Sequence, residues 1–144
     1  MARQYRYTLI RRLGNALMEP AVKLGLAPGR TWLLSVTGRR SGKRYTTPVN
    51  LVERDGVRYL VSPYGERAWV KNARAAGEVT LRRGRTVMTP HIEELPPEAA
   101  APVVADYWRQ NIITRPFFDA RPDGSEAAFV EEARRHPVFR LAEP

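Results

Sequence analysis

Residues 31–62 read TWLLSVTGRRSGKRYTTPVNLVERDGVRYLVS, and this stretch of the chain decides the fold. Its apolar beginning, residues 31–37, predicts a β-strand, which the glycine-containing segment 38–42 ends. Residues 45–54 predict a second strand, in which Pro48 favours an edge or a bulge because proline has no N–H for the sheet. The short connection between these strands indicates antiparallel pairing.

The dipeptide Asp55-Gly56 stands between two apolar runs and is the strongest hairpin signal in the chain. We therefore expect residues 57–62 to return antiparallel to the preceding strand. Residues 68–76 predict a short helix that Gly77 stops, because glycine readily takes the left-handed conformation that ends helices.

The remaining segments complete a small, mainly β barrel with peripheral helices, of the α+β class. A parallel sheet would need a helix between successive strands, and only residues 63–77 are long enough for one. The further predicted elements are strands 78–83 and 85–95 around an Arg83-Gly84 turn, a helix from Pro96-Pro97 to Gln110, a loop at 111–124, a helix at 126–135 capped by Ser125, and an extended segment at 136–141.

The 144 residues fit one domain, with residues 1–28 as an N-terminal arm and 29–144 as the barrel. Apolar side chains at three- and four-residue spacing in residues 5–26 predict a basic amphipathic helix, which Pro20 breaks or kinks. Such a helix either packs on its own domain or lies on an anionic membrane surface. Because no transmembrane run or signal peptide is visible, we expect a cytoplasmic protein, membrane-associated in the second case.

Positive charge is concentrated in the front of the chain. Residues 1–90 hold 18 basic and 5 acidic side chains, a net charge of +13, whereas residues 91–144 hold 6 and 10, a net charge of −4. This asymmetry predicts an anionic partner for the front part, the alternative being a basic surface that serves solubility.

Several kinds of catalytic site are absent from the sequence. There is no cysteine, so disulfides and thiolate nucleophiles are excluded. Residues 38–43 resemble a phosphate loop but have one residue too few between the glycines, and Arg44 replaces the hydroxyl that would bind magnesium. His91 and His136 have no partner at a metal-ligand spacing, so no metal site is expected. A bound cofactor is therefore the best carrier of any chemistry.

The segment 38–44, GRRSGKR, gathers four cations, a hydroxyl and two glycines between two predicted strands. Glycine lets backbone amides turn toward an anion, and arginine offers paired donors to phosphate or carboxylate oxygens. The segment predicts an anion-binding loop, with a solvated basic turn as the alternative.

The motifs around this loop resemble the deazaflavin-dependent nitroreductase family, the small split-barrel reductases that use coenzyme F420. Family members show T-G-R-x-S-G-x-x-x-x-x-P, then a hairpin, a loop containing glycine, and W-x-x-N-x-x-A. The likeness covers residues 10–95 and resumes at 137–141. The matching residues here are Thr37 to Pro48, Asp55-Gly56, Ser62 to Gly65, and Trp69 to Ala75.

The resemblance implies an antiparallel, FMN-binding-like split β-barrel with the coenzyme in a groove. The basic loop would bind the phosphate and oligoglutamate tail, the following strand would pass beside the deazaflavin ring, and the 62–65 loop would present backbone amides to the ring's polar edge. Trp69 belongs either to this site or to the core, and Lys71 and Arg74 either reach the tail or are solvated. The implied coenzyme-binding residues are Arg39, Arg40, Ser41, Lys43, Arg44, Thr46, Thr47, Pro48, Val49, Ser62, Pro63, Tyr64, Gly65, Trp69 and Asn72.

The implied reaction is hydride transfer from C5 of the reduced deazaflavin to an electron-poor acceptor: a quinone, an activated enone or a nitroaromatic. No catalytic side chain is assigned, although Tyr64 and Tyr107 are candidates for donating the proton. Trp108, Phe117 and Phe118 are the candidate acceptor pocket, with Tyr107 and Trp108 also suited to a core.

Three alternatives stay open at the level of sequence. They are an FMN-dependent split-barrel reductase, a non-catalytic F420 carrier, and a nucleic-acid-binding protein. The last is not expected, because no recognised motif is present and aromatic residues do not interleave with the basic run. A homodimer is an open expectation as well.

Overall fold

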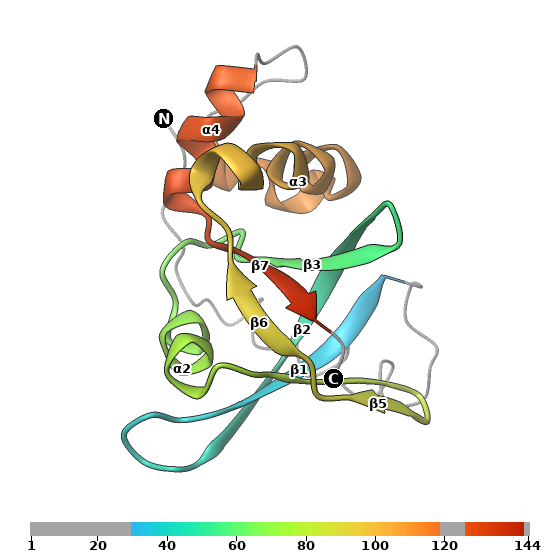
Figure 1. The fold of residues 1–144 in the computed structure, drawn as a ribbon, viewed down its shortest axis with the longest axis vertical. Coiled ribbons are helices and arrows are strands. Elements are labelled where there is room, and N and C mark those ends of the chain that lie inside the picture. The colour runs from blue at the N-terminus through green and yellow to red at the C-terminus, as the bar shows by residue number, and fades with distance from the viewer. Residues whose placement is uncertain (1–29, 119–125, 143–144) are drawn as a thin grey trace.

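The computed structural model describes residues 30–118 and 126–142 (Figure 1). The predicted helix at 5–26, the whole predicted N-terminal arm at 1–28, and the Ser125 cap lie outside the described residues. Within the described part, no helix is both long enough and apolar enough to span a membrane.

A seven-stranded antiparallel sheet curls into a half-barrel, which confirms the predicted fold class. The spatial order of the strands is β5-β4-β1-β2-β3-β7-β6. Their bounds are β1 Thr31–Thr37, β2 Arg44–Arg54, β3 Val57–Val61, β4 Thr80–Arg83, β5 Thr86–Met88, β6 His91–Glu94 and β7 Val138–Ala142.

Strand β2 changes its partner along its length. Residues 44–50 pair with β1, and residues 51–54 pair with β3. The β2–β3 hairpin turns at Asp55 and Gly56 with φ of 52° and 77°, as predicted, because a turn with two positive φ values matches the twist of paired strands. Pro48 pairs with Leu33 of β1 in the part of β2 that has no second described strand beside it, as its missing N–H requires.

The prediction of one strand over residues 85–95 is wrong. The segment forms β5, which pairs with β4, and β6, which pairs with β7 at the other edge of the sheet order. Pro90 lies between them and cannot donate to a neighbouring strand, but its carbonyl accepts a hydrogen bond from the Val79 amide at 3.2 Å. The chain therefore changes partner at Pro90 instead of continuing one ladder.

Four helical segments of the described chain lie around the sheet. Helix α2 spans Ala68–Ala76 and ends at Gly77 with φ of 76°, and α3 spans Pro97–Gln110, both as predicted. Helix α4 spans Glu126–Arg135 and packs on α3, as Figure 1 shows. The predicted loop at 111–124 contains a 3-10 helix, η1, at Ile112–Phe117.

The sheet buries a core on each of its faces because side chains of a strand alternate between them. One core joins Val52, Val61 and Val138 to α3 and α4. The other lies inside the half-barrel, joins Leu34, Leu60, Leu81 and Phe139, and is closed by α2. The basic segment 38–43 lies outside both cores, at the tight connection between β1 and β2.

Candidate functional site

The basic loop, residues 38–43, is closed by its own backbone. The Gly38 amide donates to the Lys43 carbonyl at 2.6 Å, and the Gly42 amide donates to the Gly38 carbonyl at 2.9 Å. Gly42 has a φ of 70°, which favours glycine, and a Cβ on Gly38 would lie 2.7 Å from the ring of Tyr45. The backbone of this turn therefore favours glycine at position 42, and a side chain at position 38 would force Tyr45 and Ser41 to shift.

Asn72 fastens the basic loop to α2. Its buried Oδ1 accepts the backbone amide of Arg39 at 3.1 Å and the Arg39 Nη1 at 2.7 Å. The two predicted site residues are thus in contact, and Asn72 positions the loop through Arg39.

The other cations of the loop region point to solvent. Arg40, Lys43 and Arg44 are exposed and make no ion pair with the residues that the structure describes. The Ser41 hydroxyl accepts the Lys43 amide at 3.2 Å and lies 3.4 Å from the Tyr45 hydroxyl. Concentrated positive charge without a described counterion is the property of an anion-binding surface.

The start of β2 extends this surface as an open sheet edge. Among the described strands, only β1 pairs with residues 44–50, so the opposite backbone edge of this segment carries no strand. Thr46 and Pro48 share one sheet face with Ser35 and Leu33, and the Thr46 hydroxyl lies 3.1 Å from that of Ser35. The alternate residues, Thr47 and Val49, lie opposite Leu34 and Trp32 on the half-barrel face.

The 62–65 loop, residues Ser62 to Gly65, is a tight turn between β3 and α2. The buried Ser62 hydroxyl donates to the Gly65 carbonyl at 2.5 Å, and the Gly65 amide donates to the Ser62 carbonyl at 3.3 Å. Tyr64 is half-buried and meets Phe117 of η1 edge-on, with 4.8 Å between ring centroids. Two predicted site residues from distant segments are thus neighbours.

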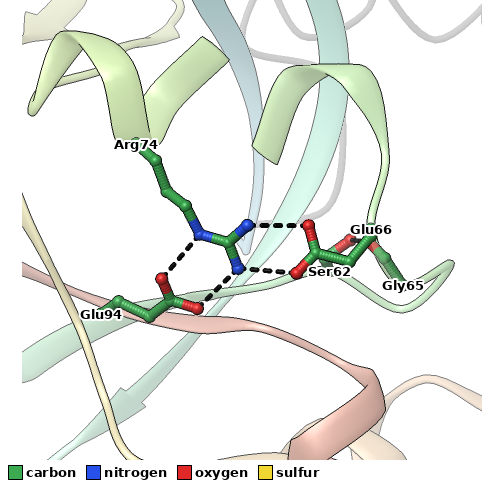
Figure 2. Close-up of polar contacts among 5 residues, drawn as sticks. All are labelled: Ser62, Gly65, Glu66, Arg74 and Glu94. Carbon is green, nitrogen blue, oxygen red and sulfur yellow. Dashed lines mark hydrogen bonds and ion pairs between the residues drawn. The ribbon is translucent and has the colours of Figure 1, made fainter. Parts of the chain in front are cut away.

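Arg74 of α2 is bound by two carboxylates, as Figure 2 shows. It donates from Nη1 and Nη2 to both carboxylate oxygens of Glu66 at 2.7 and 2.6 Å, and from Nε and Nη2 to those of Glu94 at 2.7 Å. Its pKa is raised by hydrogen bonds to Glu94 and Glu66, and the pKa of Glu66 is lowered by its hydrogen bonds to Arg74. Arg74 therefore joins α2 to β6, whereas Lys71 is exposed.

The predicted aromatic residues separate into buried and accessible members. Tyr107, Trp108 and Phe118 are buried in the core that α3 and α4 form with the sheet, whereas Phe117 is half-buried at its margin. Trp69 is half-buried and packs against Phe139 inside the half-barrel, so it contributes to that core.

Sequence reasoning missed the carboxylates Glu66, Glu94 and Glu132. Glu132 in α4 and His136 just after its end are both buried, and their spacing of four residues was a readable signal for contact. Glu66 and Glu94 are far from each other in sequence, and no spacing rule joins them to Arg74. Within the described residues, no group of three or more histidines and carboxylates could hold a metal ion.

Comparison with known proteins identifies relatives of this fold. A family model described as F420H(2)-dependent quinone reductase matches residues 11–129. No curated protein matches the chain. The solved structure of an F420-H2-dependent reductase, FDR-A, is 24% identical with a TM-score of 0.51, over 78% of this chain and 94% of that one.

Two further solved structures share the fold. A FAD-binding protein from Mesorhizobium loti is 19% identical with a TM-score of 0.51, over 90% of this chain and 89% of that one. A structure described as a domain-swapped dimer is 20% identical with a TM-score of 0.54, over 92% of this chain and 96% of that one. These similarities place the half-barrel among split-barrel, FMN-binding-like folds.

Replacing Glu66 by Gln is expected to lower the free energy of unfolding by about 0.5 kcal/mol at neutral pH, because half-exposed ion pairs contribute little. Arg74 lowers the pKa of Glu66, so this contribution is present above the ordinary carboxyl pKa and is lost as the pH falls through the lowered value. Urea unfolding of the wild type and Glu66→Gln should therefore show a difference that shrinks toward acid pH.

Glu98→Gln is the matched control, because Glu98 is more exposed and lies 3.9 Å from Arg134. It should change the unfolding free energy little at any pH. A Glu66→Gln effect that stays constant between neutral and acid pH would contradict the role given to the Arg74 pairs.

Proposed function

The chain belongs to the F420H(2)-dependent quinone reductase family, and we propose that it reduces an electron-poor organic acceptor, with a quinone as the first candidate. Membership makes it an F420H2-dependent oxidoreductase by family. The acceptor, the hydride step and the residues of the site are parts of the proposal.

The observation that carries the proposal is the exposed charge of the basic loop beside the open edge of β2. Arg40, Lys43 and Arg44 have no ion pair within the described chain, and Arg39 is anchored by Asn72. A coenzyme tail with one phosphodiester and several carboxylates needs several cations, more than the single phosphate of FMN does. The donor set therefore fits F420, and the family gives no support to the FMN alternative.

The ring would lie along residues 46–49 of β2, whose free edge offers backbone donors and acceptors. The 62–65 loop is the second backbone segment of the proposed ring site. The Ser62 amide donates to the Pro137 carbonyl and the Gly65 amide donates to the Ser62 carbonyl, so the shape of this loop is fixed by its own backbone. In this arrangement Ser62 and Asn72 shape the site and do not react.

When bound, the reduced coenzyme supplies a hydride from its C5. Conversion of a quinone to a quinol takes that hydride and one proton, and the oxidised coenzyme is the other product. Tyr64 is the better proton donor of the two candidate tyrosines, because it is half-buried beside Phe117 whereas Tyr107 is 3% exposed. The chain's part is to align the acceptor and exclude water.

The first experiment is titration of the full chain with oxidised and reduced F420, beside FMN and NADPH, followed by menadione and then a nitroaromatic in the same cuvette. Binding of F420, followed by its oxidation on adding menadione, is the expected result. Binding without oxidation by any acceptor would favour a carrier, and absence of F420 binding would overturn the proposed function.

Charge variants test the role of the basic loop. Arg40→Met and Lys43→Met are each expected to weaken F420 binding about fivefold to tenfold, with a smaller salt dependence than the wild type shows. Arg85→Met is the control, because Arg85 is exposed in the β4–β5 turn, near the opposite end of β1. Equal affinity of the loop variants and this control would argue against the loop as the tail site.

Phe117→Ala is expected to alter acceptor turnover more than F420 affinity, because Phe117 borders Tyr64 and not the basic loop. Steady-state rates with menadione and a nitroaromatic, together with the F420 dissociation constant, measure both quantities. Phe129→Leu, in the core of α3 and α4, is the control for general loosening. An unchanged acceptor profile would remove Phe117 from the pocket.

A homodimer and membrane docking are two further proposals. The similar structure described as a domain-swapped dimer supports a homodimer for this chain. Membrane docking through residues 5–26 would bring the site to lipid quinones. Liposome sedimentation of the full chain beside a variant lacking residues 1–26 tests the docking, since equal pelleting would count against it.

A further inference from the structure

Two buried ionisable side chains at the end of α4 have no part in the proposed reaction. Glu132 is 1% exposed and His136 is 4% exposed. The His136 Nε2 lies 3.2 Å from the Glu132 Oε2, and the His136 Nδ1 lies 3.2 Å from the Ser62 carbonyl oxygen. The imidazole therefore stands between a carboxylate and the 62–65 loop.

The contact with Ser62 fixes the role of one ring nitrogen. A carbonyl oxygen only accepts, so Nδ1 must carry a hydrogen to bond Ser62. The His136 Nε2 and the Glu132 Oε2 lie within ion-pair distance but without the geometry of a hydrogen bond between them, so the bond from Nδ1 is the polar link between the imidazole and the 62–65 loop.

The His136 contact meets the 62–65 loop at Ser62, whose amide and hydroxyl both donate hydrogen bonds. The Ser62 amide donates to the Pro137 carbonyl at 2.9 Å, and the Ser62 hydroxyl donates to Gly65. A Cβ on Gly65 would lie 3.2 Å from the Arg135 carbonyl, so the loop lies directly against the end of α4. Residues 135–137 therefore contact the 62–65 loop and support it.

Other side chains also lie around the imidazole of His136 and its neighbour Glu132. Arg135 donates to the second carboxylate oxygen of Glu132 at 2.9 Å. Phe118 stacks on the imidazole at 4.0 Å between centroids, with the titratable Tyr107 behind it at 6.2 Å from Phe118. On the neighbouring elements α3 and β7, Glu98 pairs with Arg134 and Arg140 pairs with Glu93.

We propose that His136 is a positioning residue, whose Nδ1–H bond to the Ser62 carbonyl fixes the 62–65 loop in the shape that receives the coenzyme. Because the receiving role of the loop comes from the proposed function, this inference rests on it. Loss of this donor would release the Ser62 carbonyl and loosen the loop.

Three variants and two measurements test the proposal. His136→Phe keeps a flat ring against Phe118 but removes both nitrogens, and His136→Asn keeps an amide N–H donor near the position of Nδ1. His91→Phe changes the other histidine, which is exposed on β6, and is the control. The measurements are the hydrogen-exchange protection of the Gly65 amide without coenzyme, and the F420 dissociation constant, both at neutral pH.

We expect His136→Phe to reduce Gly65 protection about tenfold and to weaken F420 binding by a similar factor, as for loss of one buried hydrogen bond. His91→Phe should change neither. His136→Asn should recover part of both properties, because it restores a donor to the Ser62 carbonyl.

Unchanged Gly65 protection in His136→Phe would overturn the inference, and so would equal losses in His136→Asn and His136→Phe. If His136→Phe does not fold, His136→Asn decides alone, because loss of its Gly65 protection would overturn the inference. If the wild type does not bind F420, the proposed function fails, but the protection measurements still decide whether His136 positions the loop.

Discussion

The change of partner along β2 is the constraint on which the rest of the structure depends. Its first seven residues are paired with β1 and its last four with β3, so one strand belongs to both halves of the curled sheet. This arrangement puts the basic loop at one end of β2 and the Asp55-Gly56 hairpin at the other. It also leaves the edge at residues 44–50 unpaired among the described strands, next to the exposed cations Arg40, Lys43 and Arg44.

Local sequence signals predicted the elements that local interactions determine. The Asp55-Gly56 turn and the Gly77 helix end follow from backbone preferences of the residues themselves, and both are where the sequence indicated. The division of 85–95 at Pro90 was missed, because the segment is apolar enough for one strand and only the positions of β4 and β7 show that it serves two. Such long-range pairing leaves no periodic pattern in the sequence.

Part of the candidate site could likewise be predicted from the sequence. Motif order identified the basic loop, Asn72 and the 62–65 loop, and the structure joins Arg39 to Asn72 and Tyr64 to Phe117. The structure also shows that Arg74 forms ion pairs with Glu66 and Glu94, two residues that belong to none of the motifs. The sequence already suited Trp108 to a core, whereas the burial of Phe118 was not readable, since an aromatic residue has the same letter in a core and in a pocket.

The double hydrogen bond from Arg39 to Asn72 has a consequence for the speed of ligand capture. Together with the backbone bonds that close residues 38–43, it makes folding, and not binding, the step that removes the loop's conformational entropy. An arriving anion then meets a loop that is already ordered, so binding costs little further conformational entropy of the loop. Encounter with such a surface is governed by long-range attraction, so the association rate should be fast and should fall as ionic strength rises.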